Sequence, residues 1–296
     1  MSDSTVPNQV RNRGESARKA NTAQTIYGGK PAHFVDFASI TGALLAFGAL
    51  FVAVILEGGD LKSLIHLPAA ILVFGGTIGA GVMSFRASTL MQIPALLKRI
   101  FTEQRRDVSE VIHLISRFAD KARRDGLLSL ENDAKALDEP LFKQGIFLVI
   151  DGTDAETIRD VLSTDLHYQE MRYRAEESIF TTLGGFAPTL GIIGTVMGLI
   201  HMLAQLNDPG KMGPLISGAF IATLYGVTSA NLLFLPIAHK LRAIASEELL
   251  LQEVVLEGVL AIQAGNSPRL VEERLKSYVT PRQREMMFSV RGGGRR

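Results

Sequence analysis

The sequence predicts an all-α integral membrane protein with four transmembrane helices and a large helical cytoplasmic segment between the second and the third. Four apolar stretches interrupt an otherwise charged chain of 296 residues. Each is close to the roughly 20 residues that a helix needs to cross a bilayer. Apart from His201, these stretches contain no Asp, Glu, Lys, Arg or His. No segment alternates at the period of two that half-buried strands show. The four stretches are residues 37–56, 67–85, 179–206 and 214–238.

The basic residues are distributed in blocks, although the net charge is only +1. Five Lys and Arg fall in residues 1–33, fourteen in 86–178 and ten in 239–296. The two short loops between paired apolar stretches carry one each, Lys62 and Lys211. Because basic residues stay on the cytoplasmic side of a membrane, this distribution predicts that both termini and the large central segment are cytoplasmic. The chain has no cysteine, which excludes disulfides and thiolate metal sites.

Turn residues and charge divide the chain into five segments. Gly58 and Gly59 mark the first outer turn, and a second runs from Asn207 to Gly210. The segments are a polar N-terminal tail (1–33), a first transmembrane hairpin (34–86), a cytoplasmic helical segment (87–178), a second transmembrane hairpin (179–238), and cytoplasmic C-terminal helices with a tail (239–296).

The cytoplasmic segments carry helix signals of their own. Helical spacing of apolar residues predicts a helix over 108–122, a short helix is expected over 128–137, and Pro140 begins a new element. Asp154 or Thr153 is expected to cap a helix over 156–162. An amphipathic helix continues the fourth span over 241–262. Ser267 and Pro268 then suit the N-cap and first turn of a last helix that reaches Tyr278.

Small residues recur at three- and four-residue spacing in the last two apolar stretches, so each set shares one helix face. Such residues let helices approach closely in lipid. The threonine hydroxyls, and the carbonyl that a proline leaves without its helical donor, are also oxygen ligands that sodium accepts. A threonine can equally bond its own helix, so both interpretations stay open. The two sets are Pro188, Gly191, Thr195 and Gly198, and Ala219, Thr223, Gly226 and Ala230.

Two further features concern charge. Arg123, Arg124 and Asp125 precede Gly126, and Glu131 follows, so the cluster is either a solvated helix surface or a reversible docking face. His201 is a titratable group in a membrane segment, which is a functional candidate by default. Near a helix end, a neutral imidazole at the membrane interface is the alternative. No phosphate-binding loop, GxSxG elbow or HExxH motif is present, so we do not expect an enzyme.

Five blocks over residues 35–278 resemble the flagellar motor stator family, MotA and PomA, within the wider MotA/TolQ/ExbB group. The blocks are VDFASITGALLAF, ARRDGLLSLE, GGFAPTLGIIGTVMGLIHML, AFIATLYGVTSANLLFLPIAHKL and EGVLAIQAGNSPRLVEERLKSY. The resemblance implies a subunit of the bacterial inner membrane that couples inward sodium or proton flow to torque. It implies no resident cofactor, only a transported ion, and no nucleic-acid partner.

The resemblance also implies partners. Five copies of such a chain surround two copies of a MotB/PomB-like subunit, which supplies an ion-binding aspartate and anchors to peptidoglycan. The cytoplasmic segment contacts the rotor protein FliG. A TolQ/ExbB-type energiser of a periplasm-spanning partner is the alternative with a similar core. A structural membrane scaffold without ion flux is a third.

Site residues follow by the same resemblance. Arg123, Arg124 and Glu131 match the residues that contact the rotor, although Asn132 stands where sodium-type relatives have an acidic residue. Pro188 and Pro236 match the family's prolines, and we expect them near opposite ends of the membrane region. They interrupt helix hydrogen bonding there, either as a gate that responds when the partner's aspartate is loaded or as a static kink needed only for packing.

The ion path is expected along Pro188, Gly191, Thr195 and Thr223, with Gly198 and Gly226 allowing close packing. Thr195 lies in GTxxG and Thr223 in ATLYG, at positions where sodium-type relatives resemble each other. A sodium site at these two threonines is therefore favoured over a proton path. Ala222 is a departure, because some sodium-type chains carry a further threonine there.

Overall fold

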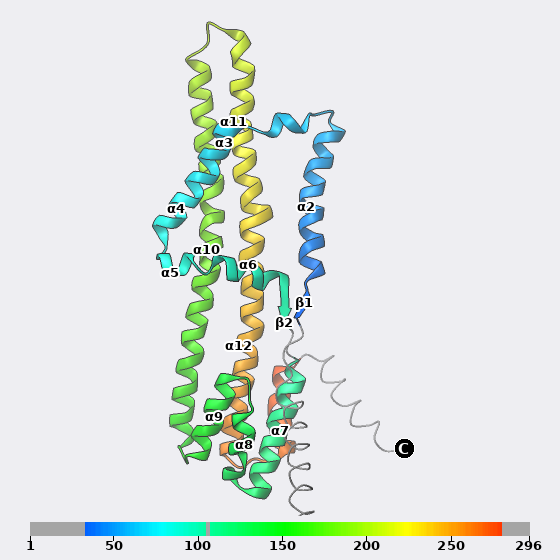
Figure 1. The fold of residues 1–296 in the computed structure, drawn as a ribbon, viewed down its shortest axis with the longest axis vertical. Coiled ribbons are helices and arrows are strands. Elements are labelled where there is room, and N and C mark those ends of the chain that lie inside the picture. Colours follow the sequence, from blue (N-terminus) through cyan, green and yellow to red (C-terminus); the bar gives the residue numbers. More distant parts are fainter. Residues whose placement is uncertain (1–32, 105–106, 280–296) are drawn as a thin grey trace, which may run out of the picture. The chain divides into compact units, whose positions relative to one another are not determined.

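The computed structural model describes residues 33–104 and 107–279, and nearly all of them are helical (Figure 1). Within these described ranges, four helices are long and apolar enough to cross a membrane, so the predicted class is confirmed. A small two-stranded sheet, which no sequence pattern predicts, pairs β1 (His33–Val35) with β2 (Thr102–Gln104). The chain divides into two compact units. One combines residues 34–103 with 171–245, and the other includes 104–170 and residues from 246 onward.

The first of these units, called the membrane unit below, contains the four apolar stretches. Its first span is α2 (Phe37–Leu56), none of whose residues is buried. The second span is α3 (Leu67–Ala70), a π-helical turn over Ile71–Gly75, and α4 (Gly76–Ser84). A 3₁₀ turn over Leu61–Leu64 precedes the second span, and α5 (Ala87–Leu90) and α6 (Ile93–Phe101) follow it.

The third and fourth spans belong to very long helices. The third lies in α10 (Ala155–Leu203), a single helix of 49 residues. We expected a helix that ends near residue 162. That boundary is wrong, because no glycine or proline interrupts residues 155–183. The fourth span runs through α11 (Pro209–Ser229), a π-helical turn (Ala230–Phe234) and α12 (Leu235–Gln263).

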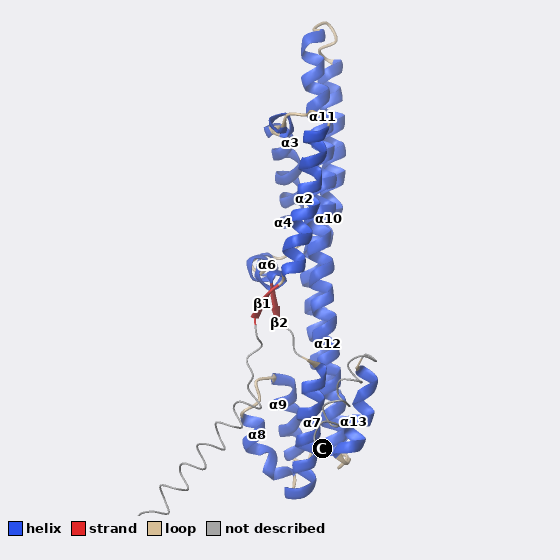
Figure 2. Ribbon diagram, turned by 90° about the vertical axis from the view of Figure 1, so that its right-hand side faces the viewer, coloured by secondary structure: helices blue, strands red, loops and turns tan. Residues whose placement is uncertain are grey.

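The second span packs on α10 and α11, and glycines set its distance from α10. A Cβ atom added at Gly76 would lie 3.1 Å from Leu190, and one added at Gly81 would lie 2.6 Å from Leu183. On the α11 side, a small buried cluster holds Ala69, Val73, Ile221 and Ala222. Figure 2 shows α3 and α4 alongside the α10 and α11 pair. The second span therefore packs against both α10 and α11, the two helices that carry the small-residue faces.

The other unit, called the second unit below, is a helical domain. Its own elements are α7 (Val108–Asp125), a 3₁₀ turn (Leu127–Leu130), α8 (Glu131–Lys135), α9 (Pro140–Ile150), α13 (Pro268–Leu275) and a last 3₁₀ turn (Lys276–Tyr278). The predicted start at Pro140 is confirmed, as is the Ser267 cap, whose hydroxyl accepts from the Leu270 N–H at 3.4 Å. The helix expected over 128–137 instead begins as a 3₁₀ turn and ends at Lys135.

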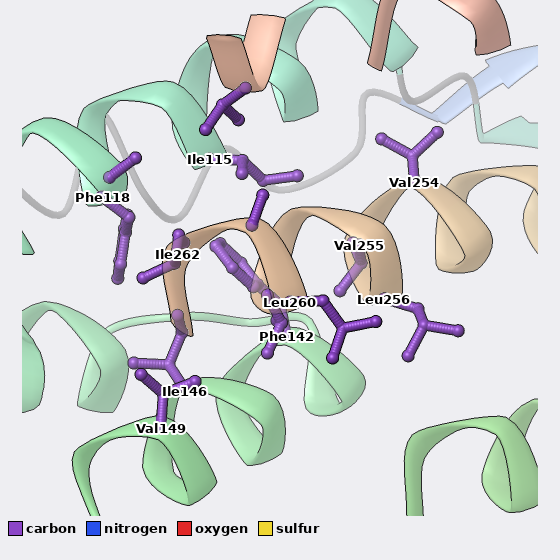
Figure 3. Packing of buried hydrophobic residues seen from close by; sticks show 14 of the residues in the cluster. Ile115, Phe118, Phe142, Ile146, Val149, Val254, Val255, Leu256, Leu260 and Ile262 are labelled. Carbon is purple, nitrogen blue, oxygen red and sulfur yellow. The ribbon is translucent and has the colours of Figure 1, made fainter. Parts of the chain in front are cut away.

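A continuous apolar core holds the second unit together. The rings of Phe118 and Phe142 lie 5.1 Å apart, and side chains from α7, α9 and α12 surround them (Figure 3). A Cβ atom at Gly258 would lie 2.6 Å from Ile115, so α7 and α12 are in close contact there. This core fixes the end of α7, which presents the charged cluster.

Candidate functional site

The two small-residue faces meet at the contact between α10 and α11. A Cβ atom at Gly191 would lie 2.9 Å from the Ala222 carbonyl oxygen, and one at Gly226 would lie 2.5 Å from the Ala187 carbonyl oxygen. About two turns further along α10, a Cβ atom at Gly198 would lie 2.7 Å from the Ala219 Cβ. These are backbone or Cβ atoms, which cannot turn aside as a flexible side chain does. These three glycines therefore lie where the backbones of α10 and α11 approach each other most closely, and their packing role stays a prediction.

The two predicted threonines face each other within this contact. The Thr195 hydroxyl hydrogen-bonds the Thr223 hydroxyl and lies 3.2 Å from the Gly191 carbonyl oxygen and 3.1 Å from that of Ala219. The Thr223 hydroxyl lies 3.5 Å from the Gly191 carbonyl oxygen. Both threonines are half-buried. The side chains and carbonyls together form a cluster of four oxygen atoms, called the oxygen cluster below.

The chemistry of the oxygen cluster allows both interpretations of the threonines. Two hydroxyl protons are shared among two carbonyls and the hydroxyls themselves, so each hydroxyl keeps a lone pair. Oxygen atoms of this kind are ligands for hard cations. In this structure the hydroxyls already bond backbone carbonyls, so a cation would have to displace those bonds. Replacing a hydrogen bond by a bond to the cation costs less free energy than leaving a buried polar group without any partner.

The two prolines do not lie near opposite ends of the membrane region, so that expectation is wrong. A Cβ atom at Gly184, one turn before Pro188, would lie 2.8 Å from the Leu235 side chain, which precedes Pro236. The reason is that α10 and the α11–α12 helix are antiparallel, so an early position in one span faces a late position in the next. A π-helical turn over Ala230–Phe234 directly precedes Pro236. Their gating role stays a prediction.

His201 lies outside the oxygen cluster. Its side chain is exposed, and its Nδ1 lies 3.0 Å from the Met197 carbonyl oxygen, one turn earlier in α10. The imidazole therefore bonds its own helix, which fits the interfacial interpretation better than a place in the ion path.

An ion pair that was not among the predicted site residues joins the start of α2 to α12. Asp36 is 5% exposed, caps α2, and accepts a hydrogen bond from Lys240 Nζ at 2.6 Å. The Lys240 ammonium, followed by the Ser39 hydroxyl, holds the pKa of Asp36 well below its usual range. A usable signal was present, because an aspartate directly before an apolar helix is a typical N-cap. Lys240 gave no signal of its own, since it lies far away in the sequence.

The charged cluster lies at the end of α7 and in the turn that follows. Gly126 has a φ of 83°, which favours glycine, and it ends the helix. Arg123 is exposed. Arg124 already pairs with Asp120 one turn back, and Glu131 pairs with Lys135 at 2.6 Å. A docking partner would thus exchange ion pairs with Arg124 and Glu131 rather than meet free charges.

These observations first define a class: a multi-pass helical membrane protein whose candidate site is made of oxygen atoms, as ion channels have. Comparison with known proteins then gives the family. The model of the MotA/TolQ/ExbB proton channel family matches residues 133–254, and the model described as "Motility protein A N-terminal" matches residues 40–126. The chain belongs to the MotA/TolQ/ExbB proton channel family, in the branch that holds the flagellar stator proteins MotA and PomA.

Individual relatives agree along most of the chain. Motility protein A of Bacillus subtilis is 36% identical over 87% of this chain and 96% of its own length. Chemotaxis protein PomA of Vibrio alginolyticus is 31% identical over 85% of this chain and 98% of its own. The solved flagellar MotAB stator complex from Bacillus subtilis contains a chain that matches with a TM-score of 0.78 and 36% identity, covering 83% of this chain and 97% of that one. The protein is thus a multi-pass inner membrane subunit of a flagellar stator, and its family is one of ion channels rather than enzymes.

Proposed function

We propose that this stator subunit couples inward sodium flow to rotation, in a complex whose other subunit brings the ion-binding carboxylate. The observation that carries the proposal is the oxygen cluster of Thr195, Thr223, Gly191 and Ala219, in spans that contain no acidic residue. A cation that loses its water needs several oxygen ligands, whereas a proton needs a single acceptor. The cluster supplies neutral ligands, and a partner carboxylate would supply the charge.

The assembly that we propose follows the family. Five copies of this chain surround two copies of a MotB/PomB-like partner, with both termini and residues 87–178 in the cytoplasm. A first span without buried residues supports contacts beyond the single chain, with lipid or with neighbouring subunits. The charged cluster at Arg123, Arg124 and Glu131 contacts FliG. Proton flow remains the alternative if sodium proves irrelevant.

Sodium dependence tests the ion. In a strain that depends on this chain and its partner, swimming speed should rise with external sodium at fixed membrane potential and pH. Thr195→Ala removes one oxygen ligand, so it should raise the sodium concentration for half-maximal speed about tenfold, the effect of one charge-assisted bond. Thr195→Ser keeps the hydroxyl and should restore most of the sodium response.

Thr189→Ala is the matched control for this substitution. Its hydroxyl lies on the same helix, is exposed, and bonds the Phe186 carbonyl at 2.7 Å. Speed that does not change as sodium is removed would refute the sodium path and leave the stator assignment unaffected.

Charge reversal tests the rotor contact. Arg123→Glu should slow rotation without lowering the amount of protein in the membrane, and a charge reversal on FliG should partly restore speed. The reduction should be partial, because an exposed ion pair contributes only about 0.2–1 kcal/mol. Tethered-cell rotation at two ionic strengths measures it. Arg269→Glu, at an exposed position in the same unit, is the control.

A second charge reversal strengthens the test. Unchanged torque in both Arg123→Glu and Glu131→Lys at physiological salt would contradict the docking proposal and leave the stator assignment unaffected.

A further inference from the structure

Tyr225 connects the fourth span to the loop between the first two spans. Its hydroxyl donates a hydrogen bond to the Leu64 carbonyl oxygen and accepts one from the His66 N–H at 3.2 Å. Its ring also packs on Phe74, with centroids 5.7 Å apart. A phenol hydroxyl within an apolar span needs partners, and here both belong to backbone of another segment. One side chain thus fixes the loop and the second span against α11.

His66 completes the same contact from the other side. Its Nδ1 accepts a hydrogen bond from the Ala69 N–H at 3.3 Å, which caps α3. A ring nitrogen that accepts leaves the other nitrogen to carry the proton in the neutral form. That nitrogen, Nε2, lies against α11, because a Cβ atom at Gly218 would be only 2.7 Å from it. Gly218 therefore makes room for the imidazole.

The contact reaches the oxygen cluster through the second span. Tyr225 follows Thr223 by two residues, so the two side chains leave α11 on different sides. Around the circumference of α11, the direction of Ala222 lies between those of Thr223 and Tyr225. Ala222 is buried against Ala69 and Val73 of the second span. On the α10 side, a Cβ atom at Gly194 would lie 2.6 Å from the Ala222 Cβ. A shift of the second span would therefore change the packing of α11 on α10, and with it the distance between the two threonine hydroxyls.

We infer that Tyr225 is a positioning residue of the ion path. It holds the outer loop and the second span against α11, and this support keeps α11 at the distance from α10 that the oxygen cluster needs. The inference rests on the proposed ion path. It assigns Tyr225 no contact with the ion itself. Loss of its hydroxyl should therefore raise the ion concentration needed for half-maximal speed and leave the maximal speed unchanged.

Tyr225→Phe is the direct test, because it removes both hydrogen bonds and keeps the ring on Phe74. We expect the sodium concentration for half-maximal swimming speed to rise about threefold to tenfold, the factor that one net hydrogen bond contributes to an equilibrium. Maximal speed and the amount of protein in the membrane should stay unchanged. Tyr168→Phe removes the same hydroxyl from an exposed site and should have no effect.

A second readout follows the loop itself. The chain has no cysteine, so Leu64→Cys introduces the only thiol. Its labelling by a membrane-impermeant maleimide should be several-fold faster when Tyr225→Phe is also present. Gly218→Ala displaces His66 and leaves the Tyr225 side chain unaltered. It should also raise the half-maximal sodium concentration and speed the labelling. It is the variant that tests the inference if Tyr225→Phe does not accumulate in the membrane.

An unchanged half-maximal concentration, or an unchanged labelling rate, overturns the inference. If the unaltered stator shows no sodium dependence, the proposed sodium path fails instead. The role of Tyr225 is then tested by the membrane potential at half-maximal swimming speed, measured in place of the sodium concentration. Tyr225→Phe should raise this potential and should still speed the labelling of the thiol at position 64.

Discussion

Gly226→Ala should abolish swimming and lower the amount of this chain in the membrane. The added methyl group would lie 2.5 Å from the Ala187 carbonyl oxygen and 3.1 Å from the Gly191 Cα. Both are backbone atoms, so α10 and α11 must separate to accept it. Overpacking of this kind typically costs about 1–3 kcal/mol. Separation would also pull the Thr195 and Thr223 hydroxyls apart, so loss of function should exceed loss of protein.

Gly79→Ala is the matched control, because a Cβ atom at Gly79 would have no heavy atom within 4 Å beyond its local backbone. The same methyl group should there leave swimming unchanged, since alanine also favours helix more than glycine does. Immunoblots of membrane fractions and swimming speed measure the two effects. Normal swimming of Gly226→Ala at normal protein levels would show that the contact between α10 and α11 opens without cost.

Much of the fold could be predicted because the signals are local. Apolar length alone located the four spans, and Pro140 and Ser267 mark helix starts by their own chemistry. The faces of Gly191 and Gly226 were predictable too, since spacing along one helix decides which residues share a face. The contact between the two faces follows from the packing of α10 and α11 as antiparallel neighbours.

Other features depend on which distant segments meet, and no local pattern contains that information. The predicted end of the helix near residue 162 was wrong because a cap at Asp154 fixes a start and says nothing about the length. The expected separation of Pro188 and Pro236 was wrong because it ignored that adjacent spans run in opposite directions. Tyr225 could have been singled out by its hydroxyl, but its partners Leu64 and His66 could not.

Lys240→Met should destabilise the membrane unit, because it removes the cation that Asp36 faces at 2.6 Å. Methionine keeps much of the apolar stem, so packing changes little. Breaking a fully buried pair costs about 3–5 kcal/mol. Lys240 is 33% exposed and Asp36 keeps the Ser39 hydroxyl, so a smaller loss of about 2 kcal/mol is expected. Thermal unfolding of the purified complex in detergent measures it.

The double variant Asp36→Asn with Lys240→Met should recover most of this loss. Asparagine still caps α2 through its side-chain oxygen, and no buried charge is left without a partner. If the double variant is as unstable as Lys240→Met alone, the loss comes from the lysine stem and not from the charge on Asp36.

The pH dependence of the same difference identifies the group responsible. The pKa of Asp36 is lowered in the folded state by Lys240, so its contribution to stability is present above the unfolded value of about 3.9. It is lost as the pH falls from that value through the folded pKa. The stability difference between the unaltered chain and Lys240→Met should therefore be constant from about pH 6 to 8 and shrink below about pH 4. A difference that changes near neutral pH would assign the effect to a histidine instead, because only histidine side chains normally titrate there.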